Sequence, residues 1–249
     1  MELGYDSTKI TPEAIAHSAE QKLPGYKFAV GAASGRQVVN ALAGVQSSSS
    51  IHRTATDPER VSFYEIGLVC PAAPKIGCGG HSKPVLNALT KDSHVAGAWI
   101  NGAGTRLAIG WKSSEVLSSE QIDQIISGFG VAANEVSRDA RINLIASFHS
   151  DSGWFDAASV DQLSEQEAGI IAARLVKRLT SRAAVTPAQQ AALRDGMARA
   201  LRANFIEGDR RDLDQQLIAT SRAAKLSRQA VASLREVVEL GIYPLPNEH

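Results

Sequence analysis

Cysteine, aromatic residues and surplus charge are all scarce in this sequence. Only two cysteines occur among 249 residues, which excludes a fold stabilised by several disulfides. Aromatic residues make up 5% of the chain, whereas apolar residues as a whole reach 44%, enough for a hydrophobic core. Lysine plus arginine and aspartate plus glutamate each number 26, so the formal net charge is zero. A balanced charge argues against a nucleic-acid partner and against electrostatic binding to anionic membranes.

Long apolar runs are also missing. No stretch approaches the roughly 20 apolar residues that a membrane-spanning helix needs. Residues 1–21, MELGYDSTKITPEAIAHSAEQ, carry polar and acidic residues in place of the apolar core of a secretory signal. We therefore expect no membrane insertion and a cytoplasmic location, where thiols are kept reduced.

Residues 1–60 have the composition of a short leader followed by a linker. Thr11 and Pro12 form a helix start, because threonine caps helix N-termini and proline is tolerated in the first turn. A second short apolar segment, VVNALAG, occupies residues 38–44, and a serine-rich polar stretch follows at residues 45–60. We predict an α-rich leader and a Ser-rich linker.

Residues 61–137 alternate between strand and helix patterns. Runs of β-branched and aromatic residues predict strands, and runs with apolar residues on one helical face predict helices. Ser118 stands three residues before Gln121, the spacing of a capping box, at the start of the second helix. The resulting order, β-α-β-β-α-β, is that of a ferredoxin-like sandwich. The predicted elements are strand 61–68, helix 82–91, strands 95–100 and 106–111, helix 118–128 and strand 131–137.

Residues 138–249 are predicted to be a helical region. Ser164 and Glu167 have capping-box spacing. The same spacing recurs at Thr186 and Gln189, and amphipathic patterns follow both pairs. We expect a bundle of helices whose surface contacts a protein client or a second copy of the chain. The fold class is therefore predicted as α+β: a ferredoxin-like βαββαβ sandwich with a short N-terminal helical leader and a C-terminal helical region.

A glycine-rich loop, KIGCGGHS at residues 75–82, contains Cys78 and His81 just before the first predicted helix of the sandwich. Two residues separate these side chains, a spacing that lets one turn present both to a single ion. The N-terminus of the helix favours the thiolate form of Cys78, which is the form that binds soft metals. A metal-binding loop is the favoured interpretation, and a glycine-rich turn with a structural thiol is the alternative.

The loop and the elements around it resemble the heavy-metal-associated domain family, the ferredoxin-like modules of copper chaperones, metal-pumping ATPases and mercury-binding proteins. Cys78 falls at the position of the first family cysteine, and His81 falls at the second. The segment QIISGFGVAANEV is similar to the family's second helix, its turn and its last strand. The resemblance covers residues 61–137 only. It implies a site for copper, zinc or mercury, with Phe129 close to the metal loop.

The sequence departs from the family pattern at the loop itself. His81 replaces the second cysteine, the family's methionine is missing, and a longer connection at residues 69–77 brings in Cys70. A linear site of two thiolates suits monovalent copper, whereas two thiolates with one imidazole better suit zinc or a three-coordinate soft ion. Cys70, Cys78 and His81 are therefore the predicted metal ligands, with His94, water or a partner as a fourth.

These observations predict a cytoplasmic protein that binds one soft or borderline metal ion and delivers, handles or senses it by ligand exchange, as a metallochaperone does. The alternative is a non-catalytic interaction or maturation factor, in which the helical region binds a partner and the sandwich is a scaffold. An enzyme is the third interpretation, either a thiol–disulfide catalyst using Cys70 and Cys78 or one in which the ion activates water. The spacing of the two cysteines differs from the Cys-x-x-Cys of redox motifs, so an enzyme is the least favoured.

Overall fold

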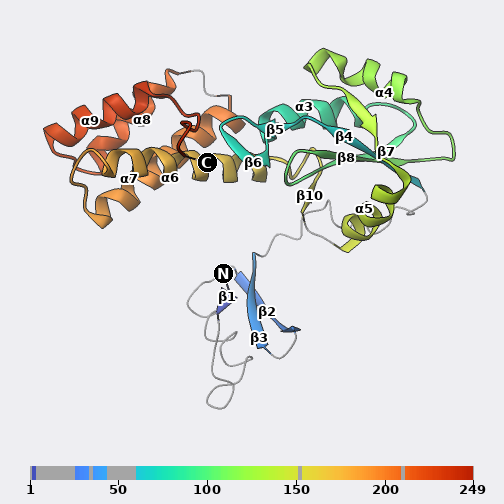
Figure 1. The fold of residues 1–249 in the computed structure, drawn as a ribbon, viewed down its shortest axis with the longest axis horizontal. Helices are drawn as coiled ribbons and strands as arrows, with labels where there is room; N and C mark the ends of the chain where they lie inside the picture. Colours follow the sequence, from blue (N-terminus) through green and yellow to red (C-terminus); the bar gives the residue numbers. More distant parts are fainter. Residues whose placement is uncertain are drawn as a thin grey trace. The chain divides into compact units, whose positions relative to one another are not determined.

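Most of the chain from residue 60 onward is described by the computed structural model, together with three short segments before it (Figure 1). The chain divides into two compact units, Met1–Ile51 and His52–His249. The predicted boundary near residue 137 falls inside the second unit. The described residues are 2–3, 26–33, 36–43, 60–150, 153–208 and 211–248.

In the first unit, the described residues form an antiparallel sheet. The strand β2 (Tyr26–Ala33) pairs along its length with β3 (Arg36–Ala43), and β1 (Glu2–Leu3) pairs with the other side of β3. The segment VVNALA therefore lies in a strand, which corrects the prediction of an α-rich leader for these residues. Adjacent valines favour extended backbone, and β2 supplies the hydrogen-bonding partner. The helix predicted after Thr11 lies outside the described residues, as does the serine-rich stretch up to residue 59.

The second unit contains a five-stranded antiparallel sheet with strand order β10-β7-β8-β4-β9. The predicted strands of the central region are all present, and β10 adds an edge strand that the sequence patterns did not predict. Gly104 has a φ of +72° in the turn between β7 and β8, a conformation that favours glycine. The strands are β4 (Val61–Ile66), β7 (Val95–Asn101), β8 (Arg106–Trp111), β9 (Ala133–Glu135) and β10 (Trp154–Phe155).

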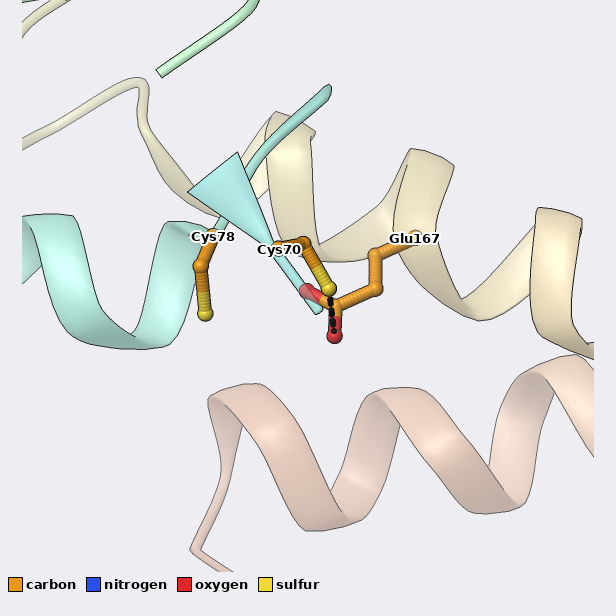
Figure 2. A group of neighbouring side chains, drawn as sticks. All are labelled: Cys70, Cys78 and Glu167. Atoms are coloured by element: carbon orange, nitrogen blue, oxygen red, sulfur yellow. Dashed lines mark hydrogen bonds between the residues drawn. The ribbon is translucent and has the colours of Figure 1, made fainter. Parts of the chain in front are cut away.

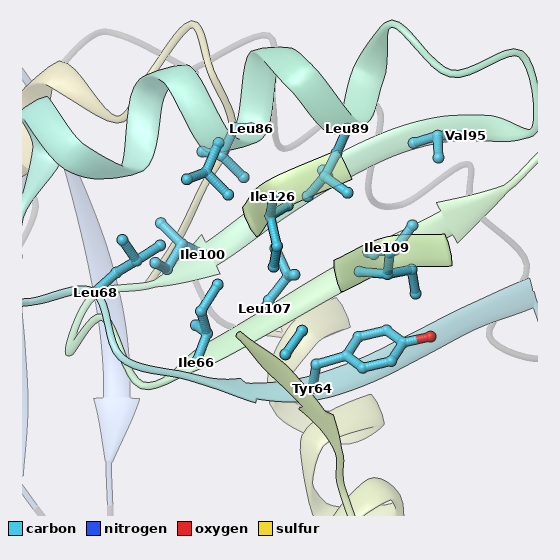
Figure 3. Packing of buried hydrophobic residues seen from close by; sticks show 14 of the residues in the cluster. Tyr64, Ile66, Leu68, Leu86, Leu89, Val95, Ile100, Leu107, Ile109 and Ile126 are labelled. Carbon is cyan, nitrogen blue, oxygen red and sulfur yellow. The ribbon is translucent and has the colours of Figure 1, made fainter. Parts of the chain in front are cut away.

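Two predicted helices, α3 (Gly79–Thr90) and α4 (Ser119–Ile126), pack on one face of this sheet and enclose its main core (Figure 3). The predicted capping box of Ser118 and Gln121 is confirmed at the start of α4. Each fully buried leucine, isoleucine or valine stabilises the fold by about 1.5–3 kcal/mol. The side chains with no more than 2% exposure in this core include Leu86, Leu89, Ile100, Leu107, Ile109, Ile122 and Ile126.

The opposite face of the sheet is covered by α5 (Arg138–Ser150), which the sequence patterns placed only within a general helical region. Phe148 from this helix packs edge-on against Phe63 and Trp99, with ring centroids 5.8 and 5.2 Å apart. Trp154 of β10 joins the same aromatic cluster. Such pairs add about 0.5–1.5 kcal/mol each beyond the area that they bury. The sheet therefore has a hydrophobic core on each of its two faces.

Four further helices share a separate core and confirm the predicted helical region. The predicted cap Thr186 is confirmed, and Ser227 caps α9 in the same way, since each side chain accepts a backbone N–H of the first turn. The cap predicted at Ser164 is wrong, because the hydrogen-bonded turn from Asp156 to Ser159 starts the helix earlier and leaves Ser164 inside it. The helices are α6 (Asp161–Thr180), α7 (Pro187–Ile206), α8 (Leu213–Ala223) and α9 (Arg228–Glu239).

The segment after α9 is held against α6 by a buried arginine. The guanidinium of Arg178, whose side chain is 3% exposed, contacts both carboxylate oxygens of Glu248 at 2.6 and 2.8 Å. It also donates to the carbonyl oxygens of Gly241 and Tyr243, each at 2.6 Å.

None of the described helices combines the length and apolar character that crossing a membrane requires.

Candidate metal and thiol site

Within the second unit, both cysteines lie where the five-stranded sheet and its helix α3 meet helix α6. A short hairpin of β5 (Val69–Cys70) and β6 (Ala73–Gly77) connects β4 to α3 and packs on α6. Cys70 is 1% exposed at the end of β5, and Cys78 follows β6 as the N-cap residue of α3 with a half-buried side chain. The longer connection predicted at residues 69–77 is thus an ordered hairpin that brings Cys70 back towards Cys78.

Backbone hydrogen bonds hold Cys78 in place. Its N–H donates to the Leu68 carbonyl oxygen at 2.7 Å, so Cys78 lies beside the strand that leads to Cys70. Its carbonyl oxygen accepts both the backbone N–H of Ser82, at 2.9 Å, and the Ser82 hydroxyl, at 2.7 Å. The preceding residue, Gly77, donates its N–H to the Gly102 carbonyl oxygen at 2.8 Å. These backbone hydrogen bonds therefore fix the position of Cys78 at the N-terminus of α3.

Gly79 allows the start of α3 to pack directly on the start of α6. A Cβ atom at this position would meet the Ser164 hydroxyl and would lie 2.7 Å from the Val160 carbonyl oxygen, too close for any side chain. Lys83 and Asp161 form an ion pair between the same two helices at 2.5 Å. This close packing places the next turn of α6, which carries Glu167, beside the two cysteines.

Cys70, Cys78 and Glu167 form what we call the thiol–carboxylate group (Figure 2). The two sulfur atoms and a carboxylate oxygen all lie within 4.8 Å of one another. The Cys70 thiol donates a hydrogen bond to Glu167 Oε1 at 2.9 Å. Glu167 is 6% exposed, so its carboxyl group faces the thiols with little access to water. Among the described residues, these are the cysteine, histidine and acidic side chains whose ligand atoms lie close enough together to bind one metal ion.

The environment of Cys78 stabilises its thiolate. The adjacent Cys70 thiol is the largest cause, and together with the backbone N–H and ring of His81 it lowers the pKa of Cys78 to about 6, although partial burial acts in the opposite direction. A position at a helix N-terminus favours an anion in the same sense. At neutral pH the predominant form of Cys78 is therefore the thiolate, the form that binds metals and attacks disulfides.

The same environment raises the pKa values of both Cys70 and Glu167. The pKa of the Cys70 thiol is raised by the adjacent Cys78 sulfur, by burial and by the neighbouring Glu167 carboxylate. Burial raises the pKa of Glu167, and the hydrogen bond from Cys70 offsets part of this rise. One buried thiol therefore lies between two acceptors, a sulfur and a carboxylate.

Arg174 holds the turn of the β5–β6 hairpin. Its Nη1 donates to the Ala72 carbonyl oxygen at 2.7 Å and to the Ile242 carbonyl oxygen at 2.8 Å. Ala72 lies two residues after Cys70, so this guanidinium links the β5–β6 hairpin to α6 and to the segment after α9.

Near the start of α6, the buried hydroxyl of Ser164 has no hydrogen-bond partner in the described part of the chain.

The predicted histidine ligands lie outside the thiol–carboxylate group. His81 lies in the first turn of α3 with an exposed side chain and is not a member of the group. His94 follows the opposite end of α3, where its Nδ1 lies 2.8 Å from Asp92 Oδ1. It is therefore too far from Cys78 to be the fourth ligand. Phe129, expected near the metal loop, packs against the main core of the sheet.

Glu167 was the functional candidate that sequence analysis missed. Its spacing from Ser164 was interpreted as a capping box, and that interpretation gave its carboxylate a local role. A buried position was nevertheless visible in the sequence, because Glu167 lies four residues before Ile171 and eight before Leu175 on one helical face. A glutamate on the apolar face of a helix indicates a specific partner, since unpaired buried carboxylates are costly.

The donor set fits a thiophilic metal ion. Sulfurs bound about 2.3 Å from a tetrahedral zinc lie about 3.8 Å apart, and the 4.8 Å limit on the separations in this group is compatible with that distance. A carboxylate oxygen is a common third ligand for such an ion.

Comparison of the chain with protein-family models, with curated proteins and with solved structures gives no match.

Proposed function

We propose that the thiol–carboxylate group binds one thiophilic metal ion, which the protein carries, delivers or senses. The observation that supports this most directly is the convergence of two sulfurs and one carboxylate oxygen within 4.8 Å. The Cys78 thiolate is available at neutral pH, since its pKa is about 6. Binding of a cation would release the proton of Cys70 and neutralise the negative charge of Glu167 in a buried setting.

The donor set favours a divalent ion of the zinc type. Monovalent copper prefers soft thiolate or thioether ligands, whereas zinc accepts sulfur together with carboxylate oxygen. In this proposal Glu167 replaces His81 as the third ligand, and His81 acts through its charge and backbone N–H on Cys78. Three protein ligands leave one position of a tetrahedral ion open for water or for a ligand from a partner.

Ion transfer would proceed by ligand exchange at the open position. Cys70 is almost completely buried, while Cys78 is half-buried and lies at the start of a helix. A thiolate from a client protein would reach the ion beside Cys78, and the ion would leave as the bonds to Cys70 and Glu167 break. The helices α6 to α9 would supply the surface that binds the client or a second copy of the chain.

The fold supports the resemblance to heavy-metal-associated domains. In the strand order β9-β4-β8-β7, the first strand of the sandwich is central and the two helices cover the same face. This is the order expected of a ferredoxin-like sandwich, to which β10 and α5 are additions. In that family the loop before the first helix carries the metal ligands, and here Cys78 occupies it.

The test is elemental analysis of the full chain, purified anaerobically without chelator, together with titration of its free thiols. We expect about one zinc per chain and thiols that react only after the metal is removed. Cys78→Ser should abolish binding, whereas His81→Ala, a change at an exposed side chain of the same turn, should retain it. An equal loss in His81→Ala would overturn this ligand set. Absence of metal and of zinc uptake, with both thiols reacting freely, would overturn the proposal and favour the scaffold interpretation.

A further inference from the structure

We propose that Cys78 and Cys70 also form a thiol–disulfide exchange site, in which Cys78 attacks a low-molecular-weight disulfide and Cys70 resolves the product with Glu167 as proton acceptor. The proposal involves the same three side chains as the metal site, but it does not depend on metal binding. It assigns a chemical difference to the two cysteines: one receives the substrate, and the other completes the reaction.

The burial of the two cysteines separates these roles. Cys78 is half-buried at the end of the β5–β6 hairpin, whereas Cys70 is 1% exposed beneath it. A substrate disulfide can therefore reach Cys78 and is excluded from Cys70. An attacking thiol that is accessible and a resolving thiol that is sheltered prevent the substrate from reacting at the wrong sulfur.

The two sulfurs are close enough for the second step. They lie within 4.8 Å of each other, and a disulfide requires about 2.05 Å. Cys70 lies in the β5–β6 hairpin, where the strand pairing shifts register between Val69 and Cys70, and Cys78 directly follows this hairpin. Rotation of two side chains, with a small adjustment of this irregular pairing, can close the remaining distance.

Glu167 gives the proton of the resolving thiol a destination. Its Oε1 accepts the hydrogen bond of the Cys70 thiol at 2.9 Å, so transfer needs no rearrangement. A buried thiol without such an acceptor remains protonated and is a poor nucleophile. The hydrogen bond therefore has a role in the reaction beyond stabilising the fold.

The steps balance with a disulfide RSSR as oxidant. The Cys78 thiolate attacks one sulfur of RSSR, forms the mixed disulfide and releases RS⁻, which takes a proton from water. Cys70 then gives its proton to Glu167 and attacks Cys78 Sγ. The Cys70–Cys78 bond forms, the second RS⁻ leaves, and it takes the proton from Glu167. The two thiols are oxidised and one RSSR is reduced to two RSH.

The test uses the full chain with a chelator present, so that metal binding plays no part, and oxidised glutathione as the disulfide. Samples are alkylated at successive times and analysed by mass spectrometry. Wild type should pass to the intramolecular disulfide, Cys70→Ser should stop as a mixed disulfide on Cys78, and Cys78→Ser should not react. Glu167→Gln should slow the second step by about 100-fold and accumulate the mixed disulfide, as loss of a general base does. Glu165→Gln, an exposed neighbour on α6, is the matched control.

Three results would overturn the proposal: glutathione attached first to Cys70, a wild-type mixed disulfide that never resolves, or equal second-step rates in Glu167→Gln and wild type. The first two remain decisive even where Glu167→Gln does not fold, because they involve only wild type and single cysteine variants. Failure of metal binding alone would leave all of these outcomes unchanged, so the two proposals can fail separately.

Discussion

The Cys70 thiol donates a hydrogen bond to Glu167, with 2.9 Å between Cys70 Sγ and Glu167 Oε1, although the two residues are 97 positions apart in the chain. Cys70 comes from the hairpin beside the sheet, and Glu167 comes from the first long helix of the helical core. The thiol–carboxylate group therefore exists only when these two parts of the second unit pack together. Substitutions that disturb this packing are expected to affect thiol chemistry and stability at the same time.

Gly79→Ala should destabilise the protein by about 1–3 kcal/mol, the usual cost of overpacking. The new methyl group would meet the Ser164 hydroxyl and backbone atoms of Val160 and Ser164, so helix α3 would have to move and carry Cys78 with it. The matched control is Gly80→Ala, where the nearest atom, the Phe205 carbonyl oxygen, would lie 3.7 Å away. Urea unfolding should show a lower midpoint for the first variant only; equal midpoints would contradict the packing described at this contact.

Alkylation of Cys78 by iodoacetamide should show a pH midpoint near 6 in metal-free protein, because the pKa of this thiol is about 6. Cys70→Ala removes the largest cause of this shift and should move the midpoint up towards the ordinary value of about 9. Cys70 itself should remain unmodified while the protein is folded. A wild-type midpoint near 9, measured by mass spectrometry of the modified peptide, would contradict the proposed role of Cys70.

The ion pair of Arg178 and Glu248 should make stability depend on pH at acidic values. The Arg178 guanidinium lowers the pKa of Glu248 from 4.5 to about 2. A carboxylate with a lowered pKa in the folded state stabilises the protein above its unfolded pKa, and this contribution is lost as the pH falls towards the folded value. The difference in unfolding free energy between wild type and Glu248→Gln should thus be constant above about pH 5 and shrink from there down to pH 2. A difference that stays constant over the whole range would show that the pair contributes nothing.

Local sequence signals were sufficient for most of the elements near the site. The capping boxes at Ser118 and Thr186 set helix starts correctly, because they depend on side chains within one turn. The glycines around Cys78 permit close backbone approach, and Gly79 makes it against the start of α6. The order of strands and helices in the central region followed from alternation and helical periodicity alone.

The third member of the site could not be derived in this way. The partner of Cys70 lies on a helix almost a hundred residues later, and only tertiary packing brings the two together. His81 had the spacing of a ligand, but the first turn of α3 leaves its side chain exposed. The start of α6 was also set by a turn upstream of Ser164, so a local capping signal was outweighed there.

The central claim is that Cys70, Cys78 and Glu167 bind one metal ion together. X-ray absorption spectroscopy at the zinc edge, on full-length protein loaded with one equivalent of zinc, tests it most directly. We expect two sulfur ligands at about 2.3 Å and oxygen at about 2.0 Å, with weaker zinc binding in Glu167→Gln than in Glu165→Gln. A first shell without sulfur, or with one sulfur only, would contradict the account.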